Sequence, residues 1–505
     1  MEALSSPQSY FRGDVMLNTL HRRAFMASTA AVAVTAALRP TFAADEFSAF
    51  DAVGQASLVR HKKATALDLV NAAAKRIDAA NPKLNAVVTE FFDRARTAAK
   101  DKLPDGPLTG VPYLIKDLDN VAGIRTTSGS RLMAHDIARE NGPLADKAIA
   151  GGMVLMGKTN TPEFGLTATT ESILLGACHN PWALDRSTGG SSGGAAAAVA
   201  SGMVPVAHAT DGGGSIRIPA SCCGVFGMKP SRGRMKLGDT LPGDIAVENC
   251  VSRTVRDSAT VFAMSENNAA GAPLKPVGFV AGPSKRRLNI GFGTANYFGL
   301  EPDADVKAAL EETAKLCAGL GHAVVPVKTP IDGETFIDAF LTVWASGPAN
   351  LVALAKSKGL KPEDVLEPWT LGLAEFFARK PKDAMAKSLV QFKEAEAEVT
   401  ALFKTCDAWL TPVLASPPPE LGYIAPTVPF QTCYDRIVKY VSYTPIHNVA
   451  GTPAMSVPLG MSKAGLPIGS QFAAAQGGEA TLFALAYELE SARPWAARKP
   501  GIWVG

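Results

Sequence analysis

The sequence lacks an excess of charge of either sign. Among its 505 residues 50 are basic and 47 are acidic, and the formal net charge is +3. So small an imbalance provides no excess of positive charge that would attract nucleic acid or an anionic membrane surface. Long runs of charge are also absent, and a hydrophobic fraction of 47% is ordinary, which argues against a disordered chain. These absences leave a soluble globular protein, and an enzyme is the favoured class.

The usual metal-binding patterns are missing as well. The seven cysteines have no CxxC spacing, and the seven histidines form no HExxH motif and no Cys/His cluster. We therefore expect neither a metal nor another cofactor. Because the number of cysteines is odd, at least one thiol is unpaired; buried core thiols are expected, with a disulfide in an exported protein as the alternative. The cysteines are Cys178, Cys222, Cys223, Cys250, Cys317, Cys406 and Cys433.

The first 43 residues have the layout of a twin-arginine export signal. The pair Arg22-Arg23 precedes an alanine-rich apolar run over residues 24–38 and then small residues before Asp45. As a helix this run reaches about 22 Å, short of a bilayer core of about 30 Å, which disfavours a permanent membrane anchor. We expect residues 1–43 to be the signal and the protein to be periplasmic or secreted. Met16 is the expected start of the precursor, and an ordinary amphipathic start of the fold is the alternative to a signal.

Predicted strands alternate with predicted helices along the rest of the chain. Apolar spacing indicates two helices between residues 51 and 80, the second ended by Asn81-Pro82. The apolar run 110–117 predicts a buried strand, and a helix over 306–316 is followed by a strand over 323–327. This alternation predicts an α/β chain, and no linker divides it into separate domains.

A serine- and glycine-rich segment is the most informative part of the sequence. Residues 187–194 read Ser-Thr-Gly-Gly-Ser-Ser-Gly-Gly, and three consecutive glycines, 212–214, come directly before Ser215. A flexible linker is disfavoured because the apolar, helix-forming run 195–200 follows at once. A phosphate-binding loop is a weak alternative, since no GxxxxGK[ST] motif follows a strand here.

The letters of residues 189–193 also match the GxSxG motif of an α/β-hydrolase. Three histidines, His208, His322 and His447, lie downstream as candidate bases. That motif requires a buried strand immediately before the serine, whereas residues 185–188 are polar. The hydrolase elbow is therefore disfavoured.

A third interpretation combines serines with a lysine. A serine hydroxyl needs a base near neutral pH, and an amine can serve if it is uncharged. Lowering a lysine pKa from about 10.4 to about 7 takes roughly 4.6 kcal/mol, which burial can supply. Lys116, at the end of the apolar run 110–117, is placed for this role. The three glycines before Ser215 allow backbone N–H groups to converge, as in an oxyanion hole.

These motifs resemble the amidase signature family. Gly-Gly-Ser-Ser-Gly-Gly, Asp-x-Gly-Gly-Ser-Ile-Arg and Cys-Gly-x-x-Gly-x-Lys-Pro follow in order over residues 189–230, and 24 positions separate Ser191 from Ser215, as in that family. The resemblance spans roughly residues 64–490 and is nearest to the branch of nylon-oligomer hydrolases and general amidases. It implies a single large domain over residues 44–505, of α/β class, with a mixed twisted central sheet covered by helices on both faces.

The resemblance also implies catalytic roles. Ser215 attacks the amide carbonyl, and Ser191, held after a cis peptide bond from Gly190, relays the proton. Lys116, neutral in the resting enzyme, accepts this proton and later returns it to the leaving amine. The chemistry implied is hydrolysis of a carboxylic amide C–N bond through an acyl-enzyme.

Further residues are expected to support this machinery. Ser192 is expected to support the geometry, and Asp211 and Arg217 are more simply a structural ion pair than substrate contacts. Gly212 departs from the Thr or Ile frequent in the family, which loosens the loop slightly and leaves its backbone donors intact. The backbone donors of the oxyanion hole are expected to be Gly212, Gly213, Gly214 and Ser215.

The substrate is expected to be either a small amide or a linear or cyclic oligomeric amide, with apolar groups. Phe164, Trp344 and Tyr443 are candidates to line an apolar pocket, with ordinary core packing as the alternative. The glutaminase subunit of a tRNA-dependent amidotransferase is a second functional hypothesis, disfavoured by the export signal and the near-neutral charge. A catalytically inactive amide-binding protein is a third, disfavoured because the lysine and both serines are present. We expect no nucleic-acid partner, and the choice between monomer and homodimer stays open.

Overall fold

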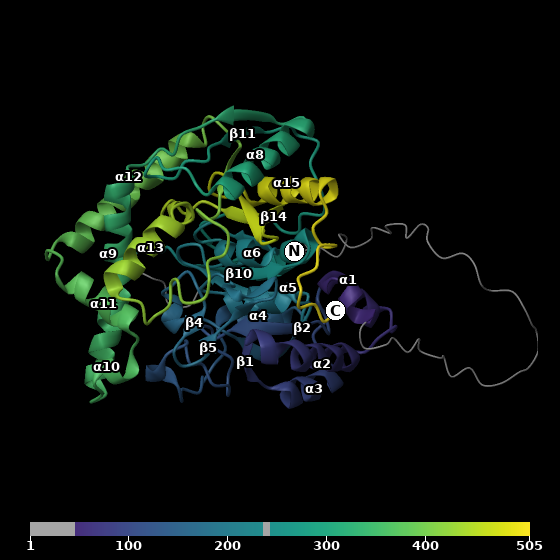
Figure 1. The fold of residues 1–505 in the computed structure, drawn as a ribbon. Helices are drawn as coiled ribbons and strands as arrows, with labels where there is room; N and C mark the ends of the chain where they lie inside the picture. Colours follow the sequence, from purple (N-terminus) through teal and green to yellow (C-terminus); the bar gives the residue numbers. More distant parts are fainter. Residues whose placement is uncertain (1–45, 236–242) are drawn as a thin grey trace, which may run out of the picture. The chain divides into compact units, whose positions relative to one another are not determined.

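A mixed sheet of eleven strands runs through the computed structural model, which describes residues 46–235 and 243–505 (Figure 1). The export segment expected at residues 1–43 lies outside the described residues. The strands of the sheet are β1 (Val87–Glu90), β2 (Pro112–Lys116), β3 (Val154–Thr159), β8 (Val206–Asp211), β9 (Phe226–Lys229), β10 (Val247–Ser252), β11 (Asn289–Phe292), β12 (Ala323–Pro326), β13 (Ala408–Pro412), β14 (Ala454–Met461) and β15 (Pro467–Ala473).

The strand order is β1-β3-β2-β8-β10-β9-β14-β15-β13-β11-β12. Strand β2 pairs in parallel with β3 and β8, and β11 pairs in parallel with β12 and β13, while the remaining pairs are antiparallel. Two small hairpins lie outside this sheet: β4 (Glu171–Ser172) with β5 (Gly176–Ala177), and β6 (His179–Asn180) with β7 (Ala183–Ser187). The predicted mixed α/β sheet is confirmed.

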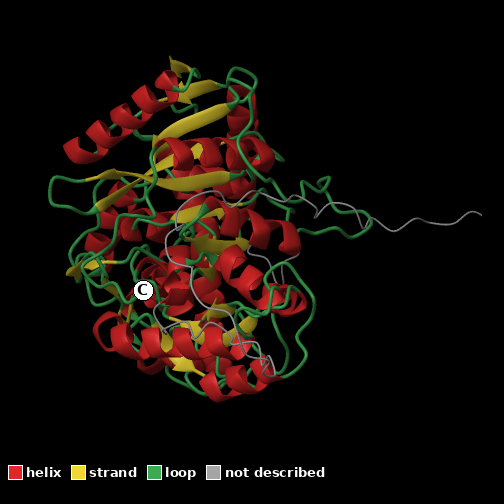
Figure 2. Cartoon of the chain, turned by 90° about the vertical axis from the view of Figure 1, so that its right-hand side faces the viewer, coloured by secondary structure: helices red, strands yellow, loops and turns green. Residues whose placement is uncertain are grey.

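Helices lie on both faces of the strands (Figure 2). They are α1 (Ala52–Arg60), α2 (Ala66–Leu84), α3 (Phe92–Lys100), α4 (Pro143–Ala150), α5 (Gly193–Ala200), α6 (Arg217–Cys223), α7 (Val255–Ser265), α8 (Ala304–Gly319), α9 (Gly333–Ser357), α10 (Pro362–Val365), α11 (Pro368–Ala378), α12 (Ala384–Leu402), α13 (Phe430–Tyr440), α14 (Pro445–Val449) and α15 (Glu479–Ala492). Short 3-10 helices cover Glu46–Ala49, Arg131–Met133 and Glu163–Gly165.

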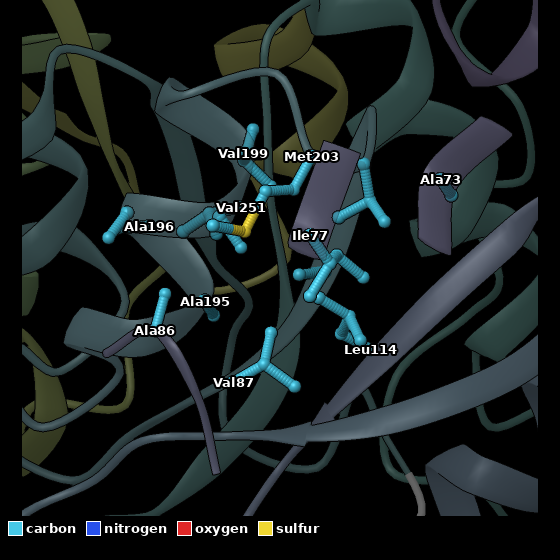
Figure 3. Packing of buried hydrophobic residues seen from close by; sticks show 14 of the residues in the cluster. Ala73, Ile77, Ala86, Val87, Leu114, Ala195, Ala196, Val199, Met203 and Val251 are labelled. Atoms are coloured by element: carbon cyan, nitrogen blue, oxygen red, sulfur yellow. The ribbon is translucent and has the colours of Figure 1, made fainter. Parts of the chain in front are cut away.

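The side chains of β2 show how both faces become buried. Leu114 belongs to one core cluster with Ile77 of α2 and Val199 of α5 (Figure 3). Its neighbours Tyr113 and Ile115 belong to a second cluster, formed with α1 and α4. Successive side chains of a strand point to opposite faces, so a strand covered on both sides reads as a continuous apolar run. This explains why the run 110–117 predicted a buried strand, which the structure confirms.

The second predicted helix is longer than expected. It continues through Pro82 to Leu84, so the expectation that Asn81-Pro82 ends it is wrong. Leu84 is fully buried in the core, which favours the additional turn. Asn85 ends the helix in the left-handed conformation at φ 49°, and the Asn81 side chain accepts the N–H of Val87 at 2.8 Å. The bond from Val87 to Asn81 fixes the turn into β1.

Helix α9 is long and apolar enough to cross a membrane by length and composition alone. Half of its most apolar window is buried inside the fold. It packs against α11 and α12 on one side of the sheet (Figure 1). Phe336 and Phe340 place its aromatic side in a core cluster, so its apolar character is accounted for by packing.

All seven cysteines are unpaired and buried, as expected for core thiols. Burial raises the pKa of the Cys178 and Cys222 thiols to about 12, so both remain protonated at neutral pH.

Candidate active site

Lys116 is the last residue of β2, and its side chain is fully buried. Its Nζ donates hydrogen bonds to Ser191 Oγ at 2.7 Å and to Thr210 Oγ1 at 2.9 Å. Burial lowers the pKa of Lys116 to about 7, although the carboxyl groups of Asp211 and Glu248 act in the opposite direction. Near neutral pH a large fraction of this amine is uncharged and able to accept a proton.

Ser191 lies between β7 and α5, and its peptide bond with Gly190 is cis. Gly165 lies against the serine hydroxyl, because a Cβ atom added to Gly165 would come within 3.0 Å of Ser191 Oγ and 2.8 Å of Leu118. Gly165 also has a φ of +69°, a conformation that side chains rarely adopt. Only glycine therefore fits beside this hydroxyl without displacing it.

Ser192 connects the start of α5 to β8. Its Oγ accepts the N–H of Thr210 at 3.3 Å and donates to the carbonyl of the same residue at 3.3 Å. Thr210 therefore bonds to both Lys116 and Ser192, a role that the sequence reasoning missed. The only signal for it was its position directly before Asp211, the first residue of the Asp-x-Gly-Gly-Ser-Ile-Arg motif.

Ser215 follows the three glycines after β8 and precedes α6. Its side chain is at the edge of the accessible surface, since the residue is 7% exposed while Ser191 is 2% exposed. The glycine turn that carries it begins at Asp211, next to the threonine that bonds to Lys116. The structure thus brings Lys116 and Ser191 into contact. Ser215 makes no hydrogen bond to either of them among the described residues, and it follows the end of β8, the strand that carries Thr210.

Asp211 and Arg217 form a buried ion pair at either end of this turn. Nε of Arg217 donates to Asp211 Oδ2 at 3.0 Å, and Nη2 donates to Oδ1 at 2.9 Å. Burial alone would raise the pKa of Asp211, but the guanidinium outweighs this effect and holds it at about 2. The carboxylate also accepts the N–H groups of Gly214 at 2.7 Å and Ile216 at 3.1 Å.

This last contact changes the expected set of oxyanion donors. Because the N–H of Gly214 donates to Asp211, it is not free to bind a developing oxyanion. Gly214 has a structural task instead, since its φ is +134° and a Cβ atom there would lie 2.3 Å from Thr444 Oγ1. The N–H groups of Gly212, Gly213 and Ser215 make no hydrogen bond to another residue in the described part of the chain.

The turn is also held by the C-terminal part of the chain, which the sequence reasoning missed. Asn448 donates to the carboxylate and to the carbonyl of Asp211, both at 2.9 Å. Thr444 donates to the carbonyl of Gly213 at 2.7 Å, and Arg217 donates to Gln471 Oε1 at 2.8 Å. No local pattern signals these contacts, because the partners are more than 200 positions apart in the sequence.

The structure also contains an apolar cavity of about 260 Å³, whose lining does not include Lys116, Ser191 or Ser215. Two sets of neighbouring residues lie between the lining of this cavity and the serine motifs. Phe164 precedes Gly165, which lies against Ser191, and Trp344 stacks on Phe340 with ring centroids 5.6 Å apart. A Cβ atom on Gly213 would lie 3.1 Å from the Phe340 ring. The cavity is lined by Phe164, Leu166, Trp344, Gly347, Pro348 and Leu351.

Tyr443, the third candidate for the pocket, does not line this cavity. It is buried, and its hydroxyl donates to the carbonyl of Thr294 at 2.8 Å. The alternative of core packing describes this residue better. Its neighbour Thr444 is the one that contacts the glycine turn.

The segment before Ser191 does not form the elbow of an α/β-hydrolase. Strand β7 belongs to the β6–β7 hairpin and not to the central sheet, and Leu184 and Asp185 on it are exposed. The serine therefore does not follow a buried central strand, as such an elbow requires.

Three comparisons agree on the kind of protein. The family model described as Amidase matches residues 68–483. A Mycobacterium leprae protein named "Putative amidase AmiC" is 39% identical over 460 residues, 90% of this chain and 97% of that protein. The 6-aminohexanoate-cyclic-dimer hydrolase of Pseudomonas sp. is 35% identical over 481 residues, 89% of this chain and 96% of that protein.

Solved structures give the same result. The structure of a 6-aminohexanoate cyclic dimer hydrolase complexed with substrate has a TM-score of 0.83 at 32% identity, covering 90% of this chain and 100% of that one. A bacterial aryl acylamidase of the amidase signature family has a TM-score of 0.80 at 26% identity, covering 89% of this chain and 99% of that one. The chain therefore belongs to the amidase signature family and is an amidase, a hydrolase of amide C–N bonds.

Proposed function

We propose that this amidase works through an acyl-enzyme on Ser215, with Ser191 and Lys116 moving the proton. The observation that carries the proposal is the 2.7 Å contact between Lys116 Nζ and Ser191 Oγ, in a site where burial leaves much of the amine uncharged. An uncharged amine in this position can take a proton from a hydroxyl, and a second hydroxyl can pass its own proton along.

The reaction then has two halves. Ser215 Oγ bonds to the amide carbon while its proton passes to Ser191, and the Ser191 proton passes to Lys116. The C–N bond breaks as this proton returns through Ser191 to the leaving nitrogen, which departs as the amine. Water then attacks the ester carbon and gives a proton to the same relay. The bond between the acyl carbon and Ser215 Oγ breaks, this oxygen takes the proton back, and the carboxylic acid leaves.

The backbone of the glycine turn stabilises the tetrahedral intermediates. We assign this role to the N–H groups of Gly212, Gly213 and Ser215, because the N–H of Gly214 is committed to Asp211. Donors fixed before the reaction stabilise developing charge without reorganising, and removing one such donor typically costs about 100- to 1,000-fold in kcat. The Asp211–Arg217 pair maintains the turn and does not need to touch the substrate.

The cavity suggests the class of substrate. Its six described lining residues include no charged side chain, and two are aromatic. Such a pocket favours amides with a hydrocarbon or aryl group over glutamine, whose charged end it would leave unpaired. The names of the similar hydrolase and aryl acylamidase point the same way.

A panel of amides tests this function. Anilides, short aliphatic amides, amino-acid amides and 6-aminohexanoate oligomers are compared, with Ser215→Ala as the blank. Turnover of the apolar members by the wild type and none by the variant is expected. A fluorophosphonate should add covalently to Ser215 in intact-protein mass spectra, and turnover by Ser215→Ala would refute the assignment.

We also propose that residues 1–43 direct twin-arginine export, on the strength of Arg22-Arg23 and the apolar run after them. N-terminal sequencing of protein recovered from the periplasm should begin near Ala44. Replacing both arginines with lysine should retain the full-length chain in the cytoplasm, and unchanged export would contradict the proposal.

A further inference from the structure

A group of buried polar side chains lies beside Lys116 and takes no part in the proposed proton relay. Asp119, His208 and Glu248 each place one nitrogen or oxygen within 4.8 Å of the others. Burial raises the pKa of Tyr113, with smaller contributions from Cys250, Asp119 and Glu248. The atoms with no hydrogen-bond partner among the described residues include Tyr113 Oη, Asp119 Oδ2, His208 Nε2 and Glu248 Oε2.

His208 is bonded directly to the backbone of the lysine. The N–H of Lys116 donates to His208 Nδ1 at 3.3 Å. Strands β2 and β8 pair in parallel at Leu114 and Ala207. Two residues further along β2, the N–H of Lys116 donates to the imidazole of His208 and not to a backbone carbonyl of β8. The contact therefore holds the end of β2 to β8 at the residue that carries the amine.

This contact also defines the proton on the ring. Since Nδ1 accepts a hydrogen bond, the proton of a neutral imidazole lies on Nε2, which faces Glu248 Oε2 at 3.9 Å. Burial, together with the amines of Lys116 and Lys158, lowers the pKa of His208 to about 3. Burial raises the pKa of Glu248 to about 8, so this carboxyl does not favour an imidazolium at neutral pH. The ring stays neutral, and Nδ1 remains an acceptor.

We propose that His208 is a positioning residue of the reaction, which fixes the backbone of Lys116 so that its Nζ meets Ser191. The inference rests on the role proposed above for Lys116. The amine has to satisfy two short contacts at once, 2.7 Å to Ser191 and 2.9 Å to Thr210. A catalytic group misplaced by about 1 Å can cost about 100-fold in rate. His208 does not line the cavity proposed for the substrate. Replacing His208 is therefore expected to lower kcat and to leave KM nearly unchanged.

His322 provides a matched control. Its Nδ1 likewise accepts a backbone N–H, from Leu288 at 3.0 Å, and its Nε2 lies 3.0 Å from the carboxyl group of Glu488. It is also buried, but it precedes β12, which forms one edge of the sheet, whereas β2 and β3 lie near the other edge. A purely structural effect of losing a buried imidazole should therefore appear equally at both positions.

The test compares kcat, KM and Tm of leucine and asparagine variants at the two histidines, with Ser215→Ala as the blank. His208→Leu should lower kcat roughly 100-fold and change KM less than about twofold. His208→Asn carries an amide oxygen near the place of Nδ1 and should recover at least about tenfold of this loss. His322→Leu should lower Tm but keep kcat within about twofold of the wild type.

Three results would overturn the proposal: a folded His208→Leu enzyme with wild-type kcat, an asparagine variant no more active than the leucine variant, or an equal loss of kcat in His322→Leu. If His208→Leu does not fold, His208→Asn is compared with His208→Gln, whose amide reaches the place of Nε2 instead, and equal kcat values would overturn it. A failure of the proposed function would be visible separately, as turnover by Ser215→Ala.

Discussion

Arg217 donates two hydrogen bonds to the carboxylate of Asp211, with N–O distances of 3.0 and 2.9 Å, and neither side chain is exposed to solvent. The same carboxylate accepts the N–H groups of Gly214 and Ile216 on either side of Ser215. The conformation of the turn that carries the proposed nucleophile therefore depends on a charge pair that does not itself line the apolar cavity.

Arg217→Met should remove this support. The variant leaves a buried carboxylate without its partner, which lowers the free energy of unfolding by about 3 to 5 kcal/mol. Urea unfolding followed by circular dichroism measures the loss. Arg379→Met is the control, because Arg379 and Glu375 form an exposed pair, and its effect should stay within about 1 kcal/mol. Equal effects of the two substitutions would contradict this account.

The pH dependence of kcat/KM should show an acidic limb with an apparent pKa near 7. The amine of Lys116 must be uncharged to accept a proton, and burial lowers its pKa to about 7, so activity rises as pH increases through this value. Lys116→Met should lower kcat/KM by about 100- to 10,000-fold. It should also abolish this limb. A limb near pH 7 that persists in the methionine variant would assign the titration to another group.

Gly165→Ala should impair the proposed proton relay although Lys116, Ser191 and Ser215 are all still present. The added methyl group would come within 3.0 Å of Ser191 Oγ at a φ of +69°, so the hydroxyl must move away from the amine. A loss of about 100-fold in kcat is expected. Gly465→Ala is the control for backbone strain alone, because its φ is +75° and no atom lies within 4 Å of the added Cβ. If both variants lose kcat equally, strain and not contact with Ser191 is responsible.

Gly347→Leu should alter substrate preference. Gly347 lines the cavity, and a Cβ atom there meets nothing within 4 Å, so the larger side chain can enter the space without a clash. We expect kcat/KM for a bulky anilide to fall about 10- to 200-fold while that for a short aliphatic amide is retained. Gly319→Leu on α8, whose Cβ is equally unobstructed, controls for a glycine replaced in a helix. Parallel losses on both substrates would show that the cavity does not receive the acyl or amine group.

Local patterns predicted much of this molecule. The strand ending at Lys116 could be recognised because a strand buried on both faces is apolar throughout, and the motifs around Ser191 and Ser215 are contiguous in sequence. The apolar candidates Phe164 and Trp344 do line one cavity, whereas Tyr443 is packed elsewhere. Composition could not separate these cases, because an apolar side chain suits a pocket and a core equally well.

Other features depend on tertiary structure. The donation from Gly214 to Asp211 follows from the course of the turn, which three glycines leave undetermined. The contact between Lys116 and His208 joins residues on two strands. Helix α2 continues past Pro82 because Leu84 is buried in the core. The local sequence does not show which distant residues form that core.

Thr444 and Asn448 donate to the turn, and Gln471 accepts a hydrogen bond from Arg217 beside it, which has a consequence for how the enzyme matures. Ser215, the proposed nucleophile, is synthesised long before the residues that hold its turn, so we expect activity to arise only when translation is nearly complete. A protease that trims the chain before residue 444 would leave every proposed proton-transfer residue in place and still yield an inert product.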